Sequence, residues 1–132
     1  MIFGIGTDIL EARRIEETYL RFGERFVHRL LMPEELAMFP AARYAVRFLA
    51  MRFAAKEAIV KAMGTGFANG MWIRDTGVKP DAFGRPQIIF SSRGRALCDR
   101  LGIGDGHLTL SDEAGLVVAV AVLMRREQAG RA

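Results

Sequence analysis

The residues from Arg43 to Gly66, RYAVRFLAMRFAAKEAIVKAMGTG, constrain the fold more than any other stretch of the chain. Apolar residues recur there close to helical spacing, alanines lie between them, and no proline interrupts the run. This pattern predicts one long helix. Gly64 lies where the helix is expected to end, because glycine readily adopts the left-handed conformation of a helix C-cap. The rest of the chain is expected to be organised around this helix.

Charged residues inside this apolar helix are its unusual feature. Arg52 and Lys56 are four residues apart, as are Glu57 and Lys61, and each such pair meets on one helix face. One interpretation is a solvated face with a salt bridge, worth about 0.3–0.5 kcal/mol. The other is a phosphate site, in which three cations hold an anionic ligand and the carboxylate holds a divalent ion. One carboxylate holds magnesium poorly, so the second interpretation requires another elsewhere.

Length and composition indicate one globular domain. The chain has 132 residues, and we predict a single domain over residues 1–124 with a polar tail at 125–132. The net charge of +4 favours an acidic or phosphorylated partner. Cys98 is the single cysteine, which excludes an intrachain disulfide and suggests a reducing, cytoplasmic location. With no apolar run near 18 residues and no basic leader, we expect neither a membrane span nor a signal peptide.

The remaining elements predict an α+β domain. Helices and strands do not alternate strictly, so a mainly antiparallel sheet packed with the long central helix is favoured over a parallel βαβ arrangement. The expected strands are 2–7, 72–79, 87–90, 107–110 and 116–123. The other expected helices follow Asp8, span 24–31, begin at Pro33, and span 93–101 with Ser92 as the cap.

Asp8 closes the first predicted strand. Gly4 and Gly6 within that strand indicate a close approach of another backbone or a bulge. An aspartate between a strand and a helix is by default an N-cap. A carboxylate at a strand end is also a frequent place for binding chemistry, so both interpretations of Asp8 stay open.

Four blocks of sequence carry a family resemblance. They are GIGTDI from Gly4, RFAAKEA from Arg52 followed by KA and GTG, GRP from Gly84, and HLTLS from His107. In this order and spacing they resemble the holo-acyl-carrier-protein synthases, small bacterial phosphopantetheinyl transferases. The match covers nearly the whole chain. Asp112 stands where many members have a histidine, so no role of that histidine is carried over.

The resemblance implies a reaction and a fold. Members have a 4′-phosphopantetheinyl transferase-like fold and move the phosphopantetheine arm of coenzyme A onto a serine hydroxyl of an acyl carrier protein. The reaction serves fatty acid biosynthesis, releases adenosine 3′,5′-bisphosphate and needs Mg²⁺. By resemblance, Asp8 and Glu57 bind the metal and Lys61 holds a diphosphate oxygen. These three are the predicted catalytic residues, and Asp8 is the second carboxylate that the magnesium interpretation requires.

Further residues are expected to bind coenzyme A. Besides Lys61, these are Arg52 and Lys56 for the nucleotide phosphates, the glycine turn Gly64, Thr65 and Gly66, and His107. A histidine at a strand edge is more often structural, and only the resemblance places His107 near the coenzyme. The base that accepts the serine proton stays open between Glu57, a metal-bound water, and a carboxylate at Asp112–Glu113.

The first helices are expected to bind the acidic carrier protein. The expected contacts are Arg14, Arg21, Phe22, Arg25 and Phe26, which combine positive charge with apolar anchors. The alternative is a solvated basic face over buried phenylalanines. The resemblance also implies a homotrimer with active sites between subunits.

Three rival functions make different demands on these residues. Nucleic-acid binding is disfavoured, because the arginines are dispersed and no binding motif is present. A non-catalytic coenzyme A sensor would keep the cations but would not need both carboxylates. A transferase that serves a secondary-metabolism carrier protein would share these motifs.

Overall fold

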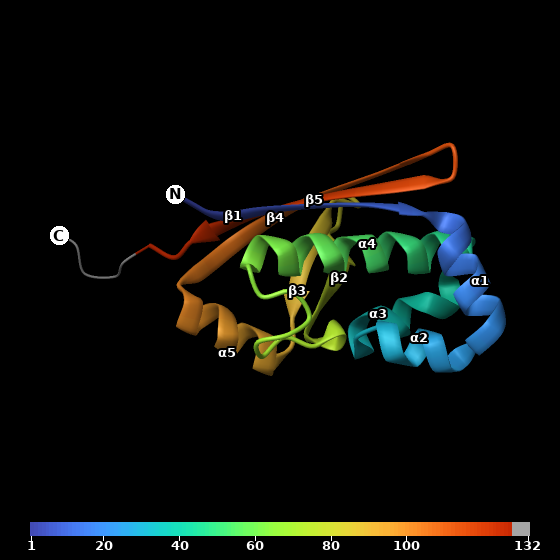
Figure 1. Ribbon diagram of the computed structural model, residues 1–132, viewed down its shortest axis with the longest axis horizontal. Coiled ribbons are helices and arrows are strands. Elements are labelled where there is room, and N and C mark those ends of the chain that lie inside the picture. Colours follow the sequence, from blue (N-terminus) through green and yellow to red (C-terminus); the bar gives the residue numbers. More distant parts are fainter. Residues whose placement is uncertain (128–132) are drawn as a thin grey trace.

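The computed structural model describes residues 1–127, which form a helix layer beneath an antiparallel sheet (Figure 1). The expected α+β class is confirmed. In chain order the elements are β1 (Ile2–Glu11), α1 (Ala12–Phe22), α2 (Glu24–Leu30), α3 (Pro33–Met38), η1 (Phe39–Ala41), α4 (Ala45–Met63), η2 (Ile73–Asp75), β2 (Thr76–Pro80), β3 (Pro86–Phe90), α5 (Ser92–Leu101), β4 (Ile103–Glu113) and β5 (Leu116–Arg125).

Two antiparallel sheets make up the strand content. The larger has the strand order β1-β5-β4, and β2 pairs with β3 in a separate hairpin. Helix α4 lies along one face of the larger sheet and packs against β1 and β5 (Figure 1). This arrangement makes α4 the centre of the molecule.

The contact between β1 and α4 depends on two glycines. A Cβ atom on Gly4 would overlap the carbonyl oxygen of Ala62, and one on Gly6 would overlap that of Ala58. The strand backbone therefore rests directly on the helix backbone, as only glycine and small residues allow. The close approach predicted from the glycines is confirmed, and it brings the residues that follow Gly6 to the side of α4.

Helix α4 ends as predicted. Gly64 adopts the left-handed conformation with φ of 80°, and its N–H donates to the carbonyls of Val60 and Lys61. The helix begins at Ala45, two residues later than the start of the predicted stretch. Its buried residues lie nearly all round, as expected of a helix covered on several sides.

Several predicted boundaries were wrong. Strand β1 continues past Asp8 to Glu11, so the N-cap position of α1 is Glu11 and the N-cap interpretation of Asp8 is excluded. The residues after Trp72 form a 3-10 turn before β2 begins at Thr76. Ser91, not Ser92, caps α5 by accepting the N–H of Gly94 at 3.0 Å. In each case the local pattern located the element but not its end.

The last hairpin is longer and tighter than predicted. Strand β4 begins at Ile103 and reaches Glu113, so the expected five-residue turn shrinks to Ala114 and Gly115. Both residues have positive φ, at 53° and 79°, as in the two-residue turns that suit the twist of antiparallel strands.

The predicted tail starts inside β5. Arg125 belongs to the strand and donates its N–H to Met1 O at 2.7 Å, and Arg126 N–H donates to Gly102 O at 2.8 Å. Residues 128–132 of the predicted tail lie outside the described residues. Among residues 1–127, no helix combines the length and apolar character needed to cross a membrane.

Candidate active site

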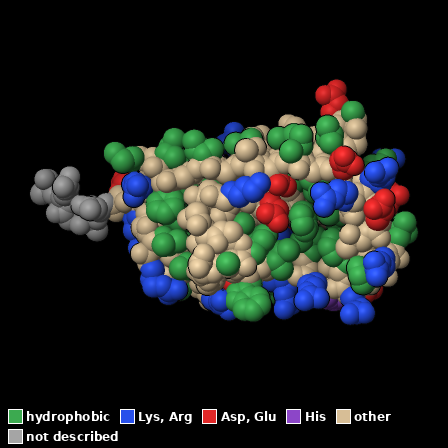
Figure 2. Space-filling view, viewed as in Figure 1, with side chains coloured by type: hydrophobic (Ala, Val, Ile, Leu, Met, Phe, Trp, Pro, Cys, Tyr) green, Lys and Arg blue, Asp and Glu red, His purple; other side chains and the backbone are tan. Residues whose placement is uncertain are grey.

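Asp8 and Glu57 line one cleft between β1, α1 and α4. The cleft has a volume of about 540 Å³, and Arg14, Phe26 and Phe53 also line it. Asp8 reaches the helix because it shares the inward face of β1 with Gly4 and Gly6, which alternate with outward residues. Acidic and basic side chains lie next to each other over the middle of α4, just below β1 (Figure 2).

Lys61 is tethered to the strand beside this cleft. Its Nζ atom lies 3.2 Å from Asp8 Oδ1 and donates to Thr7 O at 3.0 Å. The side chain is half exposed, so the ammonium remains accessible to a ligand. Lys61 lies one helical turn after Glu57, and the structure therefore brings the three predicted catalytic residues together.

The two carboxylates influence each other electrostatically. Burial raises the pKa of Glu57, the negative charge of Asp8 raises it further, and Lys61 lowers it. Repulsion between nearby carboxylates is relieved when a cation binds between them. Among the residues that the structure describes, no three His, Cys, Asp or Glu side chains cluster as metal ligands. The protein would supply two ligands here, which fits Mg²⁺ because this ion keeps several waters.

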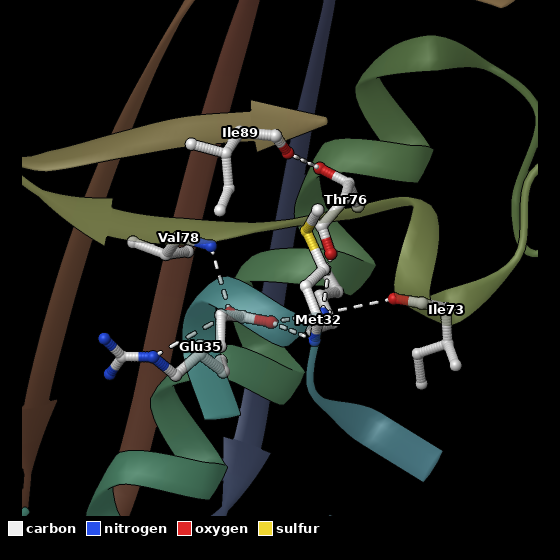
Figure 3. A network of polar contacts seen from close by, with 8 residues as sticks. Met32, Glu35, Ile73, Thr76, Val78 and Ile89 are labelled. Atoms are coloured by element: carbon white, nitrogen blue, oxygen red, sulfur yellow. Dashed lines mark hydrogen bonds and ion pairs between the residues drawn. The ribbon is translucent and has the colours of Figure 1, made fainter. Parts of the chain in front are cut away.

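Lys56 occupies a different environment from the predicted one. It is fully buried, and its ammonium lies 2.7 Å from Glu35 Oε1 and donates to Thr76 O at 2.6 Å and Ile73 O at 3.1 Å (Figure 3). An ammonium has three donors, and all three have partners inside the protein. No N–H of the Lys56 ammonium is left to bind a nucleotide phosphate. Lys56 therefore has a structural role in place of the predicted coenzyme contact.

Arg52 lines a second cleft, on the side of α4 away from Asp8. Its guanidinium lies over the Phe48 ring at 3.6 Å from the centroid, and Nε is 3.8 Å from Glu35 Oε2. Arg47 and Thr109 also line this cleft. Burial lowers the pKa of Arg52, and the negative charge of Glu35 counteracts that shift.

His107 lies in a third cleft. It is exposed on β4, opposite Val122 of β5, and its cleft is also lined by Arg85, Gln87 and Arg95. The structure of one chain therefore separates Arg52 and His107 from the cleft that holds Asp8 and Glu57.

The glycine turn follows α4 directly. The backbone N–H groups of Thr65 and Gly66 both donate to Val60 O at 3.2 Å, and Gly66 has a φ of 59°. The Thr65 hydroxyl donates to Gly66 O at 2.8 Å. The turn lies at the same end of α4 as Lys61 and is partly exposed.

The predicted carrier-binding residues lie on the surface of α1 and α2. Phe22 is 43% exposed, Phe26 is half-buried, and both line a groove with Arg25. Arg21 is exposed and its guanidinium lies 5.1 Å from the centroid of the Phe22 ring. Phe22 is therefore not a core residue, and the alternative of fully buried phenylalanines is excluded.

Comparison with known proteins decides the family. A model of the 4′-phosphopantetheinyl transferase superfamily matches residues 4–121. This chain belongs to that superfamily. The holo-[acyl-carrier-protein] synthase of Vibrio cholerae is 44% identical over 126 residues, which cover 96% of this chain and 100% of that protein.

Solved structures of the superfamily agree with the fold. The crystal structure of the holo-[acyl-carrier-protein] synthase from Neisseria meningitidis has a TM-score of 0.91 and 42% identity, and the match covers 95% of this chain and 100% of that one. The Helicobacter pylori synthase, crystallised in complex with coenzyme A, has a TM-score of 0.78 and 29% identity, with 90% and 98% covered. The predicted resemblance to holo-acyl-carrier-protein synthases is confirmed.

Two carboxylates of this transferase have charged partners that the sequence pattern does not reveal. The buried carboxylate of Glu35 contacts both Arg52 and Lys56. Asp112, between two predicted strands, accepts two hydrogen bonds from Arg47, at 2.8 and 3.1 Å. Partners 65 residues apart leave no local pattern from which the second pair could be predicted.

Proposed function

We propose that this transferase is a holo-[acyl-carrier-protein] synthase that moves 4′-phosphopantetheine from coenzyme A to a serine hydroxyl of an apo acyl carrier protein in fatty acid biosynthesis. The observation that carries the proposal is that Asp8 and Glu57 line one cleft while Lys61 contacts Asp8 beside it. The identity to synthases over nearly the whole chain supports it. The free, buried Cys98 is in keeping with a cytoplasmic location.

The reaction breaks the phosphoanhydride bond of the coenzyme A diphosphate and forms a phosphoester bond to the serine. The serine oxygen attacks the phosphorus that carries the pantetheine arm, its proton passes to a base, and adenosine 3′,5′-bisphosphate leaves with the bridging oxygen. Lys61, held by Asp8 and Thr7 O, places a positive charge where the leaving diphosphate oxygen gains negative charge. Asp8 and Glu57 would hold Mg²⁺, which when bound neutralises diphosphate charge.

The electrostatics narrow the choice of base. The hydrogen bonds from Arg47 hold the pKa of Asp112 below its usual range, which makes this carboxylate a poor proton acceptor. Glu57 instead lines the Asp8 cleft, where a carrier serine could reach it. Glu57 or a water beside it is therefore the proposed base, and Asp112 is not.

We propose that the active site forms between copies of the chain in a homotrimer. Arg52 and His107 line clefts apart from the Asp8 cleft, so a second copy would have to bring such residues to the coenzyme. Hydrophobic side chains gather along the strand layer at the upper edge of Figure 2. On β1, Ile5 and Ile9 alternate with the residues that face α4 and are 61% and 65% exposed. An uncovered apolar sheet face of this kind favours burial against another copy.

The groove of Phe22, Arg25 and Phe26 is the proposed docking surface for the carrier protein. Arg14 lines the Asp8 cleft, and Phe26 lines both that cleft and the groove. A carrier bound along this surface would therefore lie next to the carboxylates. Basic side chains around apolar anchors complement an acidic partner.

The deciding experiment measures the intact mass of an apo acyl carrier protein after incubation with this protein, coenzyme A and Mg²⁺. A gain of one phosphopantetheine that a chelator prevents supports both the reaction and the metal. A gain that persists with chelator removes the metal requirement. No gain with several carriers, while coenzyme A still binds, would favour the sensor. The paired carboxylates argue against the sensor, which has no need of a second one.

A further inference from the structure

Glu35 is a fully buried carboxylate with four charged or N–H neighbours (Figure 3). Its Oε1 atom accepts the backbone N–H of Met32 at 3.0 Å and lies 2.7 Å from Lys56 Nζ. Its Oε2 atom accepts the N–H of Val78 at 3.0 Å and lies 3.8 Å from Arg52 Nε. A buried carboxylate is tolerated when it is paired and hydrogen-bonded in this way. The group therefore joins α3, α4 and β2 at a single point.

The fold makes room for this carboxylate. A Cβ atom on Gly77 would come within 2.6 Å of the Glu35 carboxylate. The start of β2 therefore leaves room for this carboxylate only because residue 77 is glycine. Lys56 then extends the network to the carbonyls of Ile73 and Thr76. Since β2 also lines the Arg52 cleft through Val78 and Pro80, the network sets the position of one wall of that cleft.

Arg52 keeps its place beside Glu35 and Phe48 although its Nε atom lacks a hydrogen-bond acceptor in the described part of the chain. Its side chain is 14% exposed, and Nε is buried without a hydrogen-bond partner among residues 1–127. A buried unpaired donor is costly unless nearby charge compensates. The compensation here comes from the Glu35 carboxylate on one side and the Phe48 ring on the other.

We propose that Glu35 is a positioning residue of the transferase, which holds Arg52 against Phe48 so that its guanidinium lines the cleft as the contact for a coenzyme A nucleotide phosphate. The inference rests on the proposed function, because it assigns Arg52 to the coenzyme. Glu35 itself touches no ligand. It acts through Arg52, and its second contact, with Lys56, holds the cleft wall.

The charges at this point suit an anionic ligand. One carboxylate faces two cations, Lys56 and Arg52, which repel each other. The group of three therefore carries one net positive charge. Arg52 is the more accessible of the two cations, since Lys56 is fully buried. A phosphate in the cleft would meet that excess charge at Arg52.

A double-mutant cycle on the KM for coenzyme A tests the inference. Arg52→Ala should raise this KM about tenfold, the equivalent of one lost charged contact, with the KM for carrier protein unchanged. Glu35→Gln should raise the coenzyme A KM similarly in the wild-type background. In the Arg52→Ala background, Glu35→Gln should add less than about twofold. Direct titration with adenosine 3′,5′-bisphosphate should follow the same pattern.

The controls separate positioning from general stability. Glu34→Gln changes an exposed neighbour in the same turn and should leave both KM values unchanged. If Glu35→Gln fails to fold, the cycle is run in a Lys56→Met background, where no unpaired buried ammonium remains. An equal rise in KM from Glu35→Gln with and without Arg52 would overturn the positioning role. No rise from Arg52→Ala would instead refute the assignment of Arg52 to the coenzyme, and the inference with it.

Discussion

Lys56 and Glu57 are neighbours in the chain, but α4 turns by about 100° per residue, so their side chains meet different surroundings. The Lys56 side is covered by α3, η2 and β2, which supply a carboxylate and two carbonyls to its ammonium. The Glu57 side faces a cleft between β1 and α1. In the sequence both belong to one cluster of charges. The comparison teaches that a charge on a central helix becomes structural or functional according to what covers its side.

The covering element also decides what each charge is free to do. On the covered side, Lys56 has its donors satisfied within the fold, so its charge contributes to architecture. On the open side, Asp8 and Glu57 repel each other and Lys61 stays half exposed. A bound cation would relieve the repulsion between the two carboxylates, and a bound phosphate would pair with the Lys61 ammonium.

The largest expected effect is the loss of transfer activity when Glu57, on the open side of α4, is replaced. Glu57→Gln should reduce phosphopantetheine transfer by roughly a thousandfold, because it removes a metal ligand and the proposed base. The isosteric change should leave the circular dichroism spectrum and the melting temperature close to those of the wild type. Glu16→Gln, an exposed glutamate of α1, is the matched control. Retention of most of the activity would remove Glu57 from the site.

The next largest effect is the loss of unfolding free energy when Lys56, on the covered side of α4, is replaced. Lys56→Met leaves the Glu35 carboxylate buried without its ammonium, and removing one partner of a buried pair typically costs about 3–5 kcal/mol. Lys61→Met on the open side breaks a half-exposed pair and should cost less than about 1 kcal/mol. Urea unfolding of both variants measures the difference. Similar losses of unfolding free energy would mean that the two sides are not distinct.

A smaller effect is expected on the KM for carrier protein when Arg14, which lines the cleft on the open side, is replaced. Arg14→Glu should raise the KM for carrier protein about tenfold, through repulsion of an acidic partner, and leave coenzyme A binding nearly unchanged. Added salt should weaken carrier binding to the wild type more than to the variant. Arg13→Glu, at a neighbouring exposed position outside the cleft, is the control. An equal loss of coenzyme A affinity would refute the proposed division of surfaces.

The smallest effect concerns pH. Burial and Asp8 raise the pKa of Glu57 in the folded state above its unfolded value, so the folded state binds this proton more tightly. Glu57 therefore contributes stability at low pH, and that contribution is lost as pH rises from about 4.3 through the raised pKa. Glu57→Gln should flatten this part of the stability curve, measured without metal. An unchanged slope would show that Glu57 does not titrate as described.

Much of the frame follows from local chemistry that can be read in the sequence. The spacing of apolar residues located α4, and Gly64 marked its end, because helix periodicity and left-handed glycine are properties of short segments. Gly4 and Gly6 indicated the close contact of β1, which the structure places against Ala58 and Ala62. The motif blocks also identified the family.

Only the tertiary structure decided which charges are buried and where they find partners. Lys56 became structural because Glu35 reaches it from a separate helix, and Asp112 is held by Arg47 from 65 residues away. Strand ends were likewise misplaced, because β1 continues for as long as β5 pairs with it. Burial and pairing depend on contacts between distant segments, and no short window of sequence contains them.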